Sequence, residues 1–227
     1  MTDYDLKNTD PEDIEDLLKK VETSFDIKFG QGELAHLKTF GQLCDYITDK
    51  IRLDRAADCS TQQAFYKLRD ALSSTGGKEI TIDTYLADFL PRHNRRTLVK
   101  SLEKKLGFKL YLLRPPHWIT RTLFVILICA IVAWFFNWQI GLLGVTFSVA
   151  GLWFSVFIGN ELDLQTVGQL AEKMTRENYL KSRRNPQTFN QDEVEKVLRD
   201  LFSVELLIDK SKLTRDASIN RGLTHSW

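Results

Sequence analysis

The longest apolar stretch of the chain extends from Thr122 to Asn160 and contains no charged residue. One membrane-spanning helix needs about 20 apolar residues, each adding about 1.5 Å of length. The stretch is therefore long enough for two such helices. Its most polar point, at residues 137–139, predicts a tight turn between spans at 118–136 and 140–158. A transmembrane hairpin over residues 118–158 is the expectation.

Small residues recur every three or four positions in the second predicted span, at Gly141, Gly144, Ser148 and Gly151. This spacing places them on one helical face, which allows close approach of the first span. A buried hairpin of a soluble protein is the alternative, and two consecutive charge-free stretches count against it. No Asp, Glu, Lys, Arg or His lies between Thr122 and Asn160, so transport through the spans is not expected.

Basic residues gather just before the first span, and more basic residues follow the second. Positive charge marks the cytoplasmic side of a membrane, which predicts an integral membrane protein with two spans and both termini cytoplasmic. The basic residues before the span are also expected to contact anionic lipid headgroups, unless they serve only to set topology. They are Arg92, Arg95, Arg96, Lys100, Lys104, Lys105, Arg114 and Arg121. No nucleic-acid-binding motif accompanies them, so no nucleic-acid partner is expected.

A short pattern occurs twice, as "LKTFGQLCDYI" from Leu37 and as "LQTVGQLAEKM" from Leu164. In the first copy Thr39 is a suitable N-cap and Gln42 completes a capping box. Apolar residues then follow at helical spacing in both copies. Each copy therefore predicts a capped amphipathic helix. Upstream, Asp10 and Pro11 form a similar start signal for a helix that begins the chain's first apolar repeat.

Helical periodicity also occurs at 58–74, 95–106, 166–181 and 191–206, with Phe65, Leu68 and Leu72 inward in the first of these. Either Asn190 or Thr188 suits the N-cap of the last helix. The segment "FKLYLL" predicts a short strand, with one two-stranded ribbon as the extent of the β-structure. The predicted fold is mainly α, with cytoplasmic regions at 1–55, 58–114 and 161–227 around the hairpin.

The segment "IEDLLKKVETSFDIKFGQGELAHLKTFGQLCDYI" resembles the latter part of an acyl carrier protein. The segment "VEKVLRDLFSVELLIDKSKLTRDAS" resembles the first helix and long loop of the same family. Together they resemble one carrier in permuted order. The resemblance implies contacts between residues 194–206 and 14–47, within one chain or between two.

The resemblance also implies a serine that bears phosphopantetheine at the start of the second carrier helix. Pro11 stands there, and it has no hydroxyl. Ser226 is the alternative attachment residue, although His225 and Trp227 replace its expected Asp and Leu neighbours. The acidic residues Glu12, Asp13, Glu15 and Asp16 are expected to form a partner-binding surface, as carrier helices do, or only to complement the helix dipole.

No catalytic motif or metal-ligand spacing is present in the sequence, so neither an enzyme nor a metal or other cofactor is expected. The leading hypothesis is a membrane-anchored, non-catalytic interaction or scaffold protein for enzymes that handle acyl chains or lipids. A permuted acyl carrier with phosphopantetheine on Ser226 is one alternative. A purely structural integral membrane protein is the other. Membrane lipids and a protein partner are the expected contacts.

Overall fold

The computed structural model describes residues 6–73 and 79–219, and it is mainly helical, as predicted. The described residues group into two compact units that are not continuous in sequence. Unit 1 comprises Met1–Ile82, Leu106–Phe108 and Val167–Trp227, and unit 2 comprises Asp83–Lys105 and Lys109–Thr166. Most of unit 2 therefore lies between two parts of unit 1 in the sequence.

The described residues of unit 1 form helices and one very short pair of strands. Its helices are α1 (Pro11–Phe25), α2 (Phe40–Lys50), α3 (Ser60–Ser73), α8 (Val167–Glu177), α9 (Tyr179–Ser182) and α10 (Gln191–Leu206), with 3-10 turns η1 (Leu6–Asn8) and η2 (Lys210–Lys212). Strand β1 (Asp54–Arg55) pairs in parallel with β4 (Thr188–Phe189).

The predicted N-caps of α1, α2 and α10 are present. The Asp10 carboxylate accepts the Glu12 N–H at the start of α1. Thr39 and Gln42 form the reciprocal capping box of α2. Of the two candidates for α10, Asn190 is the N-cap. These signals are local in the sequence, and each satisfies a backbone N–H that the helix itself leaves without a partner.

Helices from the two ends of the sequence share one hydrophobic core. Helix α10 contacts both α1 and α2, so the expected contact between residues 194–206 and 14–47 is present within a single chain. The rings of Phe40 and Phe202 meet edge to face, with centroids 5.2 Å apart. Leu18, Leu43 and Leu198 are completely buried in the same cluster.

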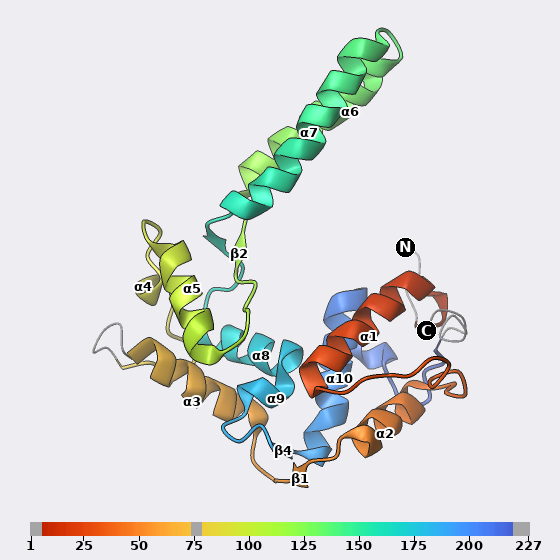
Figure 1. The fold of residues 1–227 in the computed structure, drawn as a ribbon, viewed down its shortest axis with the longest axis vertical. Coiled ribbons are helices and arrows are strands. Elements are labelled where there is room, and N and C mark those ends of the chain that lie inside the picture. The colour runs from red at the N-terminus through yellow and green to blue at the C-terminus, as the bar shows by residue number, and fades with distance from the viewer. Residues whose placement is uncertain (1–5, 74–78, 220–227) are drawn as a thin grey trace. The chain divides into compact units, whose positions relative to one another are not determined.

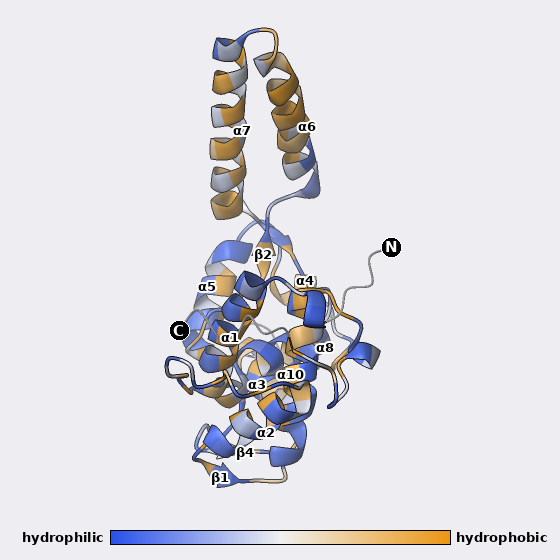
Figure 2. Cartoon of the chain, turned by 90° about the vertical axis from the view of Figure 1, so that its right-hand side faces the viewer, coloured by the Kyte–Doolittle hydropathy of each residue, from blue (hydrophilic) through white to orange (hydrophobic). Residues whose placement is uncertain are grey.

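Unit 2 contains the hairpin and a short helical base. Its helices are α4 (Leu86–Phe89), α5 (Arg95–Leu106), α6 (His117–Trp134) and α7 (Trp138–Ile158), and its strands β2 (Leu113–Arg114) and β3 (Glu161–Leu162) pair antiparallel. Helices α6 and α7 lie side by side and are apolar along most of their length (Figures 1 and 2). Both are long and apolar enough to cross a membrane.

The small residues of α7 face α6, as their spacing predicts. A Cβ atom on Gly141 would lie 2.5 Å from the Trp134 Cα atom, and one on Gly144 would lie 2.6 Å from the Ala130 Cβ atom. The turn, however, lies at residues 135–137 and not at 137–139. Asn137 is the N-cap of α7, and its side chain accepts the N–H groups of Gln139 and Ile140. Trp138, which the sequence placed in the middle of the turn, is therefore the first residue of the second helix.

The strand predicted from "FKLYLL" is wrong for most of its length. Phe108, Leu110 and Leu112 are buried in alternation, which explains the strand-like pattern. The Leu110 N–H donates to the Glu103 carboxylate at 2.8 Å, and only Leu113–Arg114 at the end pairs with another strand. A smaller correction concerns α3, where Ala64 is fully buried while Phe65 is only half-buried.

Candidate functional site

The predicted acidic surface lies on the first two turns of α1. Glu12 and Asp13 are exposed in the first turn, where negative charge favours the helix dipole. The ammonium of Lys19 lies 3.1 Å from the carboxylates of both Glu15 and Asp16. The strongest free negative charge is therefore at the very start of the helix, because Lys19 partly neutralises the second turn.

The attachment position that the carrier resemblance implies at the start of α1 holds a proline and no serine. Pro11 is the first residue of α1, next to the Asp10 cap. Ser226, the alternative residue for phosphopantetheine, lies outside the described residues. Ser24 at the other end of α1 is buried, and its hydroxyl bonds the Arg176 carbonyl and the Tyr179 N–H. That hydroxyl is used structurally.

Two of the predicted membrane-surface arginines bind the end of α7 instead of facing solvent. The Arg96 guanidinium donates to the carbonyls of Phe157 and Gly159, the latter at 3.0 Å. The Arg95 guanidinium donates to the Asn160 carbonyl at 2.7 Å. The last carbonyls of a helix lack partners within it and carry partial negative charge. Arg95 and Arg96 therefore hold the end of α7 against the start of α5.

The other basic residues differ in their surroundings. Arg92 lies 3.7 Å from the Glu161 carboxylate, and Arg114 lies 2.7 Å from that of Asp163. Lys100, Lys104 and Lys105 are exposed along α5. At about 1.5 Å per residue, Lys105 lies about 15 Å along the helix from Arg95, its first residue. Arg121 is exposed on α6 beside an open groove of about 470 Å³ that is otherwise lined by Thr120, Phe124, Val125 and Leu152.

The sequence did not predict a groove of about 870 Å³ in unit 1. Its walls come from the ends of α1 and α2, from α9 and from the segment after α9. They include Phe25, Lys28, Tyr46, Lys50, Arg52, Lys181 and Gln187. This volume is in the range of small-molecule sites. The lining residues come from three separate parts of the chain, so no local motif could have indicated the groove.

One wall of this groove is organised by Glu33. Its carboxylate accepts bonds from the Gly30 N–H, the Lys50 ammonium and the Tyr46 hydroxyl. These donors, the Gly30 N–H first, lower the pKa of Glu33 to about 2. Burial and the Glu33 carboxylate together raise the pKa of Tyr46 to about 12. The cluster fixes the loop between α1 and α2 as a stable ion-paired wall, and neither group titrates near neutral pH.

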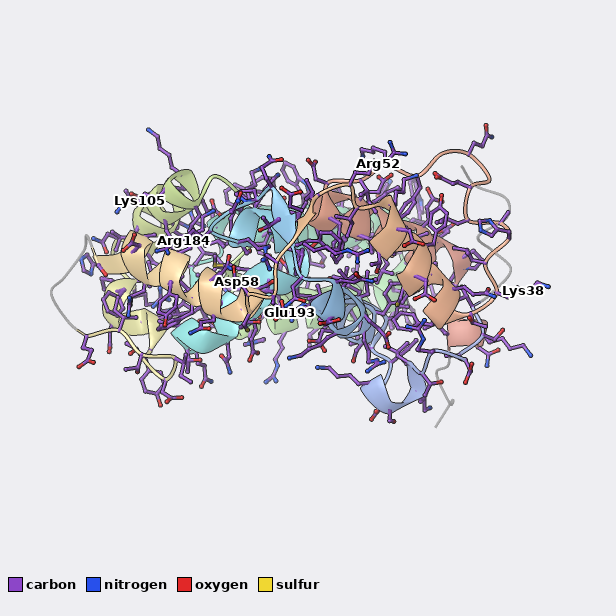
Figure 3. All side chains as sticks on the ribbon, turned by 90° about the horizontal axis from the view of Figure 1, so that it is seen from below. Lys38, Arg52, Asp58, Lys105, Arg184 and Glu193 are labelled. Carbon is purple, nitrogen blue, oxygen red and sulfur yellow. The ribbon has the colours of Figure 1, made fainter. Side chains whose placement is uncertain are left out.

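A buried polar cluster joins the starts of α3 and α10. Arg183 is completely buried and donates to the Ser60 hydroxyl and the Asp58 carbonyl. The Glu193 carboxylate accepts the Ser60 N–H at 3.0 Å, and Asp58 and Glu193 lie close together in Figure 3. Asn190 donates to the Asp58 carbonyl. Because Glu193 already occupies the anion-binding start of α3, the cluster is suited to structural fixation and not to ligand binding.

Comparison of the chain with protein-family models, with curated proteins and with solved structures gives no match. The carrier resemblance therefore depends on the quoted residues alone.

Proposed function

We propose that the chain is a membrane-anchored, non-catalytic interaction protein. In this proposal the hairpin α6–α7 spans the membrane twice, with both termini in the cytoplasm. The carrier-like helices of unit 1 recruit a protein partner, an enzyme that handles acyl chains or lipids being the class that the resemblance implies. The observation that carries the proposal is the joint core of α1, α2 and α10, combined with a proline at the expected attachment position.

The start of α1 is the proposed partner surface. Glu12 and Asp13 are exposed there, and no ion pair joins them to another described residue. A basic surface on the partner would complement this charge and speed the encounter at low salt. The remaining basic residues near the hairpin, Arg121 above all, would contact anionic headgroups in the same arrangement.

Charge reversal tests this surface. Glu12, Asp13, Glu15 and Asp16 are changed together to Lys in the full chain, and proteins captured from detergent-solubilised membranes are identified by mass spectrometry. A control for charge reversal away from this surface changes two exposed acids elsewhere in unit 1, Asp70 and Glu172, to Lys. Loss of an acyl- or lipid-handling enzyme from the first variant alone supports the proposal. Equal capture by both variants would leave the purely structural membrane protein as the better account.

The permuted carrier remains the second candidate, because α10 packs against α1 and α2 as that order of helices requires. Its test is the intact mass of the chain after co-expression with a broad-specificity phosphopantetheinyl transferase, beside a Ser226→Ala control. A mass gain that disappears in the control would replace the scaffold proposal with a carrier. An unmodified mass is the result that the scaffold proposal expects.

A further inference from the structure

Two sets of three helices follow the same plan in this chain. The first set is α3, α5 and α8, and the second set is α10, α1 and α2. The first helices share the sequence Leu-Arg-Asp, at Leu68–Asp70 and Leu198–Asp200. Their buried positions also correspond, with Ala64, Leu68 and Leu72 in α3 matching Val194, Leu198 and Phe202 in α10.

The second helices, α1 and α5, end in the same local structure. In α1 the Glu22 carboxylate accepts the N–H of Phe29, seven residues later, at 2.7 Å. In α5 the Glu103 carboxylate accepts the N–H of Leu110, also seven residues later, at 2.8 Å. A residue with positive φ follows each helix at the same position, Asp26 with φ 51° and Gly107 with φ 83°.

The third helices, α2 and α8, begin against equivalent backbone segments. The Gly41 N–H donates to the Arg215 carbonyl at 2.8 Å, and the Gly168 N–H donates to the Ile82 carbonyl at 2.8 Å. These two glycines occupy the same place in the repeated sequence. A side chain at Gly41 would collide with the carbonyl that its N–H binds, and one at Gly168 would make a tight contact with its carbonyl. The close approach explains why both copies have glycine there.

The same segments continue in matching register. An antiparallel bridge joins Thr39 to Ser218, and another joins Thr166 to Tyr85. In each case the next residue of the segment, Ile219 or Leu86, donates its N–H to the residue before the bridged threonine. We call residues 213–219 the strap; its counterpart in the first set is residues 80–86. Three kinds of hydrogen-bonded contact therefore agree between the two sets: the Glu carboxylate to a later N–H, the glycine N–H to a carbonyl, and the antiparallel bridge.

We infer that the chain contains two copies of one order of three helices with the same local backbone contacts, and that the second copy is written in permuted order. In the first copy the hairpin lies between the second and third helices. In the second copy the short connection of residues 30–38 takes that place. The part of the second copy that contains α1 and α2 is thus a binding surface. Its occupant is the strap and α10 of the same chain. This inference goes beyond the proposed function and does not depend on it.

Charge adds to the backbone contacts that hold the strap. Arg215 pairs with the Asp45 carboxylate of α2 at 2.6 Å and with Glu195 of α10. The Arg199 guanidinium donates to the Leu213 carbonyl at 3.0 Å. The strap therefore connects the third helix of the second copy to its first helix. The residue corresponding to Arg215 in the first copy is Ile82, so the ion pairs belong to the permuted copy.

Disulfide trapping in the full-length chain tests the permuted closure. Paired residues in an antiparallel bridge are about 4.5–5.5 Å apart at Cα, a separation that a disulfide can span. In a background with Cys44, Cys59 and Cys129 changed to Ala, Thr39→Cys is combined with Ser218→Cys. Tyr85→Cys with Thr166→Cys is the matched pair from the first copy. Thr39→Cys with Ala217→Cys is the off-register control, because neighbouring side chains of an extended segment point to opposite faces.

Both matched pairs are expected to form a disulfide within one chain on mild oxidation, with the loss of two thiol hydrogens. Both variants should then run as monomers on non-reducing gels, and the control pair should react much more slowly. Two results would overturn the inference. One is a first-copy pair that closes while the Thr39–Ser218 pair stays reduced. The other is a Thr39–Ser218 disulfide that forms only between two chains, because the second copy would then be completed by another molecule.

A rearranged chain tests the correspondence of the two copies by a different measurement. The new chain starts at Ala57, runs to Ile219, continues with the residues Ala-Asp-Phe-Leu copied from 87–90, and then proceeds from Asp10 to Ala56. If the copies correspond, this link supplies the missing connection, and the thermal midpoint equals or exceeds that of the natural order. A lower midpoint, with fast amide exchange in α1 and α10, would contradict the correspondence even if the disulfide forms.

Discussion

Gly41 and Gly168 are the residues at which the repeated element tolerates least change. An alanine Cβ at Gly41 would lie 2.8 Å from the Arg215 carbonyl oxygen, and at Gly168 it would lie 3.0 Å from that of Ile82. Overpacking costs about 1–3 kcal/mol, against about 1 kcal/mol gained from helix propensity. Gly41→Ala is therefore expected to lower the free energy of unfolding by about 1–2 kcal/mol, and Gly168→Ala by less.

Denaturant unfolding in detergent, followed by circular dichroism, measures both changes. Gly30→Ala is the control, since its added Cβ would meet only the flexible Glu33 carboxylate at 3.4 Å. If Gly41→Ala proves as stable as Gly30→Ala, the close approach of the strap to α2 is not present in solution.

Glu33 gives a pH-dependent prediction at the same scale. Its pKa is lowered from 4.5 to about 2 in the folded chain by the Gly30 N–H, the Lys50 ammonium and the Tyr46 hydroxyl. A lowered carboxyl pKa stabilises the fold fully above the unfolded value and progressively less as pH falls toward 2. The unaltered chain is expected to lose more stability between pH 5 and pH 3 than Glu33→Gln, which lacks this titration.

Equilibrium unfolding at several pH values distinguishes the two chains. At neutral pH, Glu33→Gln is expected to lower the free energy of unfolding by about 1 kcal/mol, because the donors lose a charged acceptor. Parallel pH curves for the two chains would show that Glu33 does not hold the α1–α2 loop. No sequence motif marks this cluster, because Gly30, Glu33, Tyr46 and Lys50 meet only after the loop closes.

At the scale of elements, the ends of helices could be predicted and the pairing of extended segments could not. Asp10, Thr39 and Asn190 act within three residues of themselves, so their signals are visible in sequence. The segment at 108–112 alternates in burial as a strand does, but its Leu110 N–H binds a carboxylate on the preceding helix. Alternate burial along a segment shows which side chains face the core. It does not show which groups the backbone of that segment binds.

The contacts that Arg95 and Arg96 make with the end of α7 could not be predicted from the sequence. Positive charge beside a span predicted lipid contact, which stays a prediction, and gave no sign that both side chains bind the carbonyls at 157–160. Arg96→Gln is expected to weaken this end by about 1–3 kcal/mol, the usual contribution of hydrogen bonds to a charged group. Hydrogen exchange should then quicken in the last turn of α7 and the first turn of α5.

Lys104→Gln is the matched control. Lys104 is exposed on the same helix, and its substitution removes the same charge. Exchange that quickens equally in both variants would assign the effect to net charge and not to the contact with α7.

For the whole molecule, sequence predicted the contact between distant segments only through the carrier resemblance. Periodicity identified α1, α2 and α10 separately, and nothing local brings α10 back to α1. Leu18, Leu43 and Leu198 share one core because each helix has an apolar face that the others cover. The correspondence of α1 with α5 escaped sequence comparison because the two helices share few identical residues and bear opposite charge. It became visible in the bonds of Glu22 and Glu103.

Removal of the hairpin is expected to keep the pairing of β2 with β3, although Arg95 and Arg96 lose their carbonyl partners at residues 157–160. Strands β2 and β3 pair Arg114 with Glu161, so the chain enters and leaves the hairpin at neighbouring positions. Replacing residues 115–160 with Asn-Gly, a two-residue hairpin turn, should keep that pairing. We expect the full chain to stay with membranes after alkaline carbonate washing, and the shortened chain to appear in the wash. Exchange protection in α1, α2 and α10 should be the same in both, because their core contains no residue of the hairpin. A full chain released by carbonate would mean that α6 and α7 do not span a membrane. A shortened chain that is released only by salt would instead show that the exposed basic residues bind the membrane surface independently of the hairpin.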